Sequence, residues 1–261
     1  MRLAARYNYV MGQIRVETRE RVAWVTIDDP ARRNALDVEL ATRLADAIVA
    51  ADADDGVGAL VITGAGDAFC AGGDRAALLA AAEAPLAERR RIIEAIYRPF
   101  LQLREARKPS VAVVRGAAVG AGLNLVLAAD VALATPRARF LAGFLAIGIH
   151  PGGGHTAMLQ ARVGSQAAAA LLLFGETLDG ARAQSLGLVY ECLDDAAIAG
   201  AAQSLAARAA AFPREVTAAA RATLLMAASA PFHEVLAREL DAQAESLGRP
   251  EALAALRARR G

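Results

Sequence analysis

The stretch Val111–Asp130, VAVVRGAAVGAGLNLVLAAD, carries the main evidence for the fold that we predict for this chain. Its first residues, Val111–Val114, form a largely β-branched run that favours a buried strand. Glycines then interrupt the pattern, and the apolar run Leu123–Ala129 has the length of a short helix. A strand, a glycine turn and a helix in this order place the unpaired N–H groups of a helix N-terminus beside the end of the strand. Such a terminus favours negative charge, either a phosphate or an oxyanion that exists only during a reaction.

Other uses of a glycine-rich turn fit this stretch less well. A dinucleotide-binding turn needs G-x-G-x-x-G, but Gly120 and Gly122 are followed by Leu125 where the third glycine should stand. A P-loop needs a lysine after its last glycine, and Lys108 is the only lysine in the chain. The segment Gly116–Ala129 is too short for a membrane helix. By itself the turn is equally compatible with a structural role, so a second motif is needed to decide.

Composition limits the classes of protein that the chain can belong to. With 261 residues, of which 56% are hydrophobic, it can bury a large core. The net charge is +1 and the charges are interspersed, which argues against nucleic acid as a partner. Cys70 and Cys192 have no paired spacing, so neither a disulfide framework nor a cysteine metal site is expected. The N-terminus has no apolar segment typical of a secretion signal, so we expect a cytoplasmic protein. Met11 could be the start as well as Met1, and we expect Met1–Val10 to be an unanchored tail.

Strand-like and helical segments alternate along most of the chain, and helices alone follow. We expect strands at Ile14–Glu17, Val22–Asp28, Ala59–Thr63, Val111–Val114, Val131–Ala134, Ala138–Leu141 and Leu188–Tyr190. We expect helices at Asp37–Asp52, from Arg75, within Pro85–Arg107, and at Leu123–Ala129, Thr156–Val163, Ser165–Phe174, Gly180–Leu186, Ala196–Ala211, Arg214–Ala228, Phe232–Leu247 and Glu251–Arg259. This order predicts an α/β core, residues 1–195, with a C-terminal α-helical region, residues 196–261.

A second glycine turn has the same arrangement as the first. The segment Ala68–Asp74, AFCAGGD, follows the strand Ala59–Thr63 and precedes the helix that begins near Arg75. Asp74 can cap that helix through its carboxylate. The backbone N–H groups of this turn would also face the ends of the strands. A third glycine-rich corner, Gly148–Gly154, stands before the helix Thr156–Val163.

Two glycine turns with this spacing resemble the crotonase superfamily, the enoyl-CoA hydratase/isomerase fold. The similarity covers nearly everything from Ile14 onward and is carried by the motifs Arg33–Leu36, Ala68–Asp74, Gly116–Asp130 and Gly148–Gly154. It implies an α/β fold of the ClpP-like type, a spiral of ββα units with a C-terminal helical region through which family members assemble. We therefore expect a trimer or a dimer of trimers.

The resemblance also implies a substrate and the residues that bind it. An acyl-CoA thioester carbonyl becomes an enolate or a tetrahedral oxyanion in the transition state, and two backbone N–H groups stabilise it, each worth about 3–4 kcal/mol. By position these donors are Ala71 and Ala121. The residues expected to bind the substrate are Arg33, Ala35, Ala71, Gly72, Gly73, Asp74, Ala121 and Phe144, with helix capping as the alternative role of Asp74. No metal and no cofactor is expected, because coenzyme A is part of the substrate.

The chain departs from the family pattern at the acid–base groups. Relatives that hydrate enoyl-CoA carry two glutamates, and their positions fall on Asn124 and Phe144, neither of which can act as a general base. Asn124 could still orient a water molecule or bind a polar acyl group. A histidine pKa near neutrality suits acid–base catalysis, so His150 is a candidate, with a structural corner residue as the alternative. His155 is less favoured because it could face away on its helix.

Other replacements for the glutamates are weaker candidates. We interpret Glu83, Glu88 and Glu94 first as residues on the solvated face of a helix. We interpret Cys70 as a small apolar side chain rather than as a nucleophile. The predicted function is therefore enolate or oxyanion chemistry on an acyl-CoA, nominally that of a hydratase/isomerase-like lyase. A catalytically silent acyl-CoA-binding protein, a decarboxylase and a thioesterase remain as alternatives.

Overall fold

The computed structural model describes residues 12–258, and the predicted tail Met1–Val10 and the alternative start at Met11 lie outside them. Within this part of the chain the strands form two sheets. The larger sheet has the order β1-β2-β3-β5-β7-β10, and in it only β1 runs antiparallel to its neighbour. Its strands are β1 (Gln13–Arg19), β2 (Val22–Asp28), β3 (Ala59–Gly64), β5 (Ser110–Val114), β7 (Val131–Ala134) and β10 (Glu191–Cys192).

The second sheet is built from short strands, most of which directly follow a strand of the first. Its order is β4-β6-β8-β9, with β4 (Ala68–Cys70), β6 (Ala117–Val119), β8 (Arg139–Leu141) and β9 (Leu178–Asp179). Three successive passes of the chain, β3–β4, β5–β6 and β7–β8, place one parallel strand in each sheet. This winding confirms the predicted α/β fold with a spiral of ββα units.

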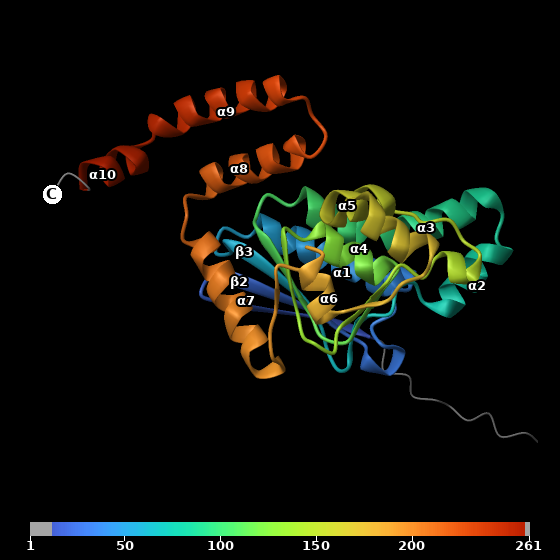
Figure 1. The fold of residues 1–261 in the computed structure, drawn as a ribbon. Coiled ribbons are helices and arrows are strands. Elements are labelled where there is room, and N and C mark those ends of the chain that lie inside the picture. The colour runs from blue at the N-terminus through green and yellow to red at the C-terminus, as the bar shows by residue number, and fades with distance from the viewer. Residues whose placement is uncertain (1–11, 259–261) are drawn as a thin grey trace, which may run out of the picture.

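Helices cover both faces of the larger sheet (Figure 1). The helices of the core are α1 (Val38–Ala53), α2 (Arg75–Glu83), α3 (Leu86–Glu105), α4 (Ala121–Ala128), α5 (His155–Leu173) and α6 (Gly180–Ser185). The helix α7 (Asp195–Ala210) packs on β2, β3, β5 and β7 through a stripe that includes Ile198, Ala202 and Ala206. A separate cluster, which includes Leu40, Phe100 and Leu123, fills the space on the other face.

The last three helices extend away from the core (Figure 1). They are α8 (Arg214–Ala227), α9 (Phe232–Leu247) and α10 (Pro250–Ala258), and α9 and α10 have no buried residue. Arg221 of α8 joins them to the core, because its guanidinium pairs with Asp130 at 2.8 Å and donates to the carbonyl groups of Leu103, Arg104 and Ala106. The division into residues 1–195 and 196–261 stays a prediction, and α7 on its C-terminal side packs on the sheet of the core.

Most of the predicted elements form, and the exceptions are short. The predicted strand Leu188–Tyr190 is wrong, because Leu188 and Val189 are buried without sheet pairing and β10 starts at Glu191. The two predicted helices Thr156–Val163 and Ser165–Phe174 appear as α5, with a break at Gly164. The strands β4, β6 and β9 were not predicted. No helix within residues 12–258 combines the length and the hydropathy needed to cross a membrane.

Candidate active site

The two predicted glycine turns lie side by side in the structure. We call residues 68–74 the first elbow and residues 116–122 the second elbow. Their strands β4 and β6 pair in parallel, so both elbows lead out of the same edge of the second sheet. Gly72 has a φ of +98°, and a Cβ atom there would stand 2.8 Å from the carbonyl oxygen of Val119 and 3.8 Å from the nitrogen of Ala121. At Gly122 a Cβ atom would stand 2.1 Å from the carbonyl oxygen of Cys70. Only glycine permits this approach.

The hydrogen bonds of the first elbow correct one predicted donor. The Ala71 N–H donates to the carbonyl oxygen of Arg33 at 3.0 Å, so it is already occupied. Leu36 donates to the Gly72 carbonyl at 2.7 Å, and Asp74 donates to the Leu36 carbonyl at 2.8 Å. Gly72 and Gly73, between Ala71 and Asp74, have N–H groups that meet no acceptor among the described residues. The donor role predicted for Ala71 therefore fits one of these two glycines instead.

The second elbow leaves an N–H group unpaired for a different reason. Ala121 is the first residue of α4, and no acceptor for its N–H occurs in the part of the chain that the structure describes. A helix has no internal partner for its first N–H groups, and its dipole adds positive potential there. Gly73 and Ala121 thus each contribute an unpaired N–H at adjoining elbows.

A buried asparagine holds the first elbow in place. Asn34 donates from Nδ2 to the carbonyl oxygens of Ala65 and Ala68 at 2.9 and 2.7 Å, and its Oδ1 accepts from the Asp29 N–H at 2.8 Å. The segment around Asn34 supplies the Arg33 carbonyl that binds Ala71. Asn34 lies within the predicted Arg33–Leu36 motif, but its role in fixing the elbow was not foreseen.

Asp74 takes the structural role that was its alternative. Its carboxylate accepts from the N–H groups of Ala76 and Ala77, at 3.0 Å each, and caps α2. A second carboxylate oxygen lies 3.6 Å from the Arg32 guanidinium. Asp74 does not line the cavity described next.

A cavity of about 500 Å³ opens in front of both elbows. Its walls are mainly apolar and come from α2, α3, the two elbows and the segment 142–150. The predicted site residues that line it are Ala71, Gly72, Gly73, Ala121, Asn124, Phe144 and His150. Arg33 and Ala35 do not line it, although Arg33 acts on the elbow through its carbonyl group. Their predicted contact with substrate stays a prediction.

The polar groups of the cavity are few, and no Asp or Glu is among the described residues that line it. Glu83, Glu88 and Glu94 do not line the cavity and are exposed, in agreement with their interpretation as residues on a solvated helix face. Arg89 and Tyr97 line the wall from α3 and were not predicted, because α3 has the pattern of a charged surface helix. Within residues 12–258 no three potential metal ligands cluster.

His155, and not His150, contacts the residue at the first glutamate position. Its Nδ1 lies 2.7 Å from Oδ1 of Asn124, and its ring meets the edge of Phe144 with centroids 4.9 Å apart. Burial lowers the pKa of His155 to about 4, so the ring is neutral at pH 7. His150 is exposed at the rim of the cavity, and its Nδ1 lies 2.7 Å from the carbonyl oxygen of Pro151. The acid–base role of His150 stays a prediction.

Cys70 lies beneath the first elbow and is fully buried. Burial raises the pKa of its thiol to about 12, so the nucleophilic thiolate is absent at neutral pH. This agrees with its interpretation as a small apolar side chain.

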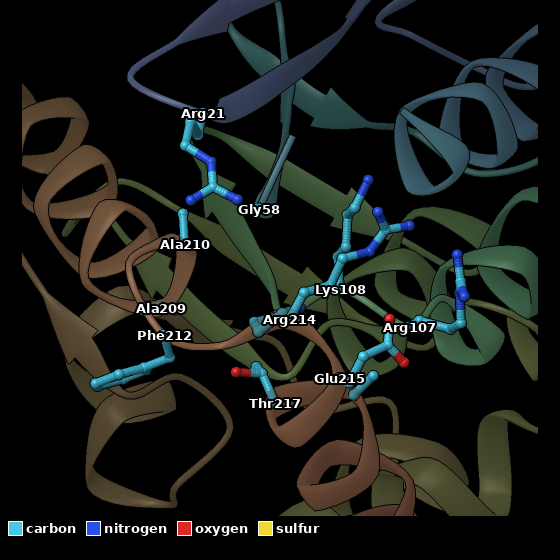
Figure 2. Close-up of a pocket in the computed structure, with 12 residues that line it drawn as sticks. Arg21, Gly58, Arg107, Lys108, Ala209, Ala210, Phe212, Arg214, Glu215 and Thr217 are labelled. Atoms are coloured by element: carbon cyan, nitrogen blue, oxygen red, sulfur yellow. The ribbon is translucent and has the colours of Figure 1, made fainter. Parts of the chain in front are cut away.

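A second hollow is cationic but has no room for a ligand (Figure 2). Arg21, Arg107, Lys108 and Arg214 are among its lining residues, yet its volume is about 10 Å³, which is at most enough for one water molecule. The Lys108 ammonium instead donates to the carbonyl groups of Ala51 and Asp54 at the end of α1. Lys108 therefore caps the C-terminal end of α1.

The fold and the site together define the class of protein. The chain has two sheets wound by ββα units, and two adjoining elbows with unpaired N–H groups line one apolar cavity. The family model for enoyl-CoA hydratase/isomerase matches residues 17–252. The chain therefore belongs to this family, which confirms the resemblance to the crotonase superfamily.

Individual relatives agree with this assignment. The chain is 47% identical over 245 residues to the Mycobacterium tuberculosis protein named probable enoyl-CoA hydratase EchA14, covering 92% of this chain and 94% of the relative. It is 32% identical over 186 residues to the 1,2-epoxyphenylacetyl-CoA isomerase of Escherichia coli K12, covering 71% of each. A crystal structure of an enoyl-CoA hydratase from Polaromonas sp. JS666 superposes with a TM-score of 0.88 at 29% identity, covering 94% of this chain and 97% of that one.

Proposed function

We propose that this protein binds an acyl-CoA thioester in the 500 Å³ cavity and stabilises the enolate or oxyanion formed from its carbonyl group. The observation that carries the proposal is the pair of unpaired N–H groups, Gly73 and Ala121, at adjoining elbows that line the same apolar cavity. Preorganised donors of this kind stabilise developing negative charge without reorganisation, and each contributes about 3–4 kcal/mol. The names of the relatives, which are hydratases and isomerases of CoA thioesters, support the same substrate class.

The proposed reaction type is that of a hydratase/isomerase-like lyase with no carboxylate base. One observation favours a second candidate: the described lining residues include no Asp or Glu. A reaction that generates the enolate without a base, such as decarboxylation of a malonyl-type thioester, needs only the elbow donors. Silent binding of an acyl-CoA and hydrolysis of the thioester need no carboxylate pair either.

A panel of thioesters separates these possibilities. The purified protein is incubated with crotonyl-CoA, a malonyl-type CoA and an aryl-CoA, and the products are identified by mass spectrometry. A mass change of any thioester identifies an enzyme and its reaction. Binding without turnover identifies a silent binder, and absence of both binding and turnover contradicts the proposal.

We also propose that copies of the chain assemble through the C-terminal helices as a trimer or a dimer of trimers. Large apolar side chains remain exposed on these helices, including Leu224, Phe232 and Leu240, at 69, 80 and 66%. An exposed apolar set of this size favours a protein contact. Light scattering that gives a monomer at micromolar concentration would contradict the assembly. The cytoplasmic location stays a prediction.

A further inference from the structure

Asn124, in the wall of the cavity, and His155 form a buried pair. Each is only 1% exposed, and Oδ1 of Asn124 lies 2.7 Å from Nδ1 of His155. Asn124 belongs to α4, whereas His155 is the first residue of α5. Buried polar side chains are retained where they are hydrogen-bonded, and this pair lies beside the groups that we propose to bind the thioester.

A backbone carbonyl fixes which way the Asn124 amide faces. Nδ2 of Asn124 lies 2.9 Å from the carbonyl oxygen of Gly152, which can only accept. The flipped amide would bring two oxygens together there, so Oδ1 must face His155. Nδ1 of His155 must then carry the hydrogen and donate it to Oδ1. The other nitrogen, Nε2, is a bare acceptor that has no partner within the described residues.

This arrangement leaves one hydrogen-bond donor of Asn124 available to a ligand. Oδ1 and one amide hydrogen are engaged, and the second amide hydrogen remains. Asn124 lines the cavity, and so does Ala121, which lies three residues earlier on the same face of α4. The two positions are about 4.5 Å apart along the helix axis. A ligand held at the Ala121 N–H would therefore meet a second donor close to its thioester carbonyl.

We propose that His155 is a positioning residue that fixes the Asn124 amide as a donor, and that the site thereby selects acyl-CoA thioesters with an acceptor oxygen near the thioester carbonyl, such as a β-carbonyl. This inference rests on the proposed binding of an acyl-CoA. A plain hydrocarbon chain leaves the amide hydrogen unpaired, and sites that offer a buried hydrogen-bonding group discriminate against ligands that cannot use it. Without His155 only one of the two hydrogen bonds that orient the amide remains, the one to the Gly152 carbonyl, so the amide is held less firmly as a donor toward the ligand.

Nitrogen NMR tests the positioning step without any ligand. The full chain is labelled with ¹⁵N-histidine, and the signal of His155 is assigned from its loss in His155→Asn. At pH 7 we expect the neutral ring with its hydrogen on Nδ1. A hydrogen on Nε2 would overturn the inference and would leave the proposed acyl-CoA binding intact.

Calorimetry tests the selection step with two thioesters that differ only in the β-oxygen, acetoacetyl-CoA and butanoyl-CoA. The ratio of their dissociation constants is measured for the wild type and for His155→Asn, His155→Leu and Asn124→Leu. The side-chain amide introduced by His155→Asn can replace the Nδ1 donor, so this variant is the matched control.

In the wild type and in His155→Asn we expect the β-oxo thioester to bind about 10-fold more tightly, the factor that one good hydrogen bond supplies. In both leucine variants we expect this ratio to fall to about 3-fold or less. If the ratio of the two dissociation constants is the same in all four proteins, the inference is wrong, whereas the proposed acyl-CoA binding is not contradicted. If neither thioester binds the wild type, the proposed function fails and the inference fails with it.

Discussion

The two elbows present unpaired N–H groups, but they do so in opposite ways. In the first elbow, hydrogen bonds to the segment 33–36 occupy the Ala71 and Asp74 N–H groups and leave those of Gly72 and Gly73 between them unpaired. In the second elbow, the chain simply enters α4, and Ala121 is unpaired because it starts a helix. The first donor is left unpaired because a separate segment of the chain binds the residues on either side of it. The second is unpaired because the first N–H groups of a helix have no internal acceptor.

This difference predicts unequal sensitivity to change. The second donor is unpaired because of a local feature, the start of α4, although the elbow also contacts Cys70 and Leu141. The first elbow depends on the buried Asn34, which binds the carbonyl groups of Ala65 and Ala68. A change at Asn34 should therefore disturb the first donor, whereas the second donor should tolerate changes outside its own turn.

The largest expected effect concerns the hydration of an enoyl-CoA, which needs acid–base groups in addition to the N–H donors of the two elbows. Asn124 and Phe144 offer no carboxylate, and general acid–base groups are each worth about 10²–10⁴-fold. We expect the protein to hydrate crotonyl-CoA at least about 10⁴-fold more slowly than a hydratase that has both glutamates. Loss of the enoyl absorbance measures the rate. Ordinary enzymatic rates would mean that another group supplies the base.

Removal of the second donor should have the next largest effect. Proline is tolerated in the first turn of a helix, so Ala121→Pro deletes the N–H while keeping the helix. For an enzyme we expect kcat/KM to fall by roughly 10²-fold or more, because such contacts strengthen in the transition state. For a silent binder we expect a loss of about 0.5–1.5 kcal/mol in binding.

Ala121→Gly is the matched control for this variant, since it keeps the N–H, and its kcat/KM should stay within a few-fold of the wild type. Circular dichroism checks that each variant is folded. A folded Ala121→Pro protein with unchanged affinity and turnover would show that the second elbow is only a turn.

Backbone esters sharpen the comparison within the first elbow. Glycolate in place of Gly73 removes only its N–H, and we expect a loss of about 10²-fold in kcat/KM. Lactate in place of Ala71 removes the bond to Arg33 and should cost about 1 kcal/mol of stability, with a small effect on turnover. The reverse order of the two effects on kcat/KM would return the donor role to Ala71.

The smallest expected effect is the pH dependence that His155 imparts to folding. Its pKa is about 4 in the folded protein, below the unfolded value of 6.5, so the unfolded chain binds the extra proton between these values. Stability from this group is complete above about pH 6.5 and is lost as the pH falls toward 4. At pH 5 the cost is about 2 kcal/mol.

Urea denaturation at pH 5 and pH 7.5 measures this difference. His155→Asn has no titrating ring, so it should lose about 2 kcal/mol less than the wild type over the same interval. Equal losses in the two proteins would mean that His155 is protonated, or accessible to protons, in the folded state.

Features that depend on neighbouring residues could be predicted from the sequence alone. The valine run of β5, the glycines of both elbows and the caps Asp37 and Asp74 were all predicted, and the structure has each of them. Propensity, hydrophobic period and capping act over a few residues, so they can be read along the chain. The family assignment followed from these motifs and their order.

The pairing of polar groups, and with it the choice of groups left for a ligand, came from the tertiary structure. Ala71 is occupied by Arg33 from a separate segment, and Asn124 is fixed by His155, 31 positions later. The two-residue strands β9 and β10 exist because of their neighbours in the sheets. The pattern of residues does not encode these pairings, because a hydrogen bond depends on distance and direction in space, which the packed fold alone supplies.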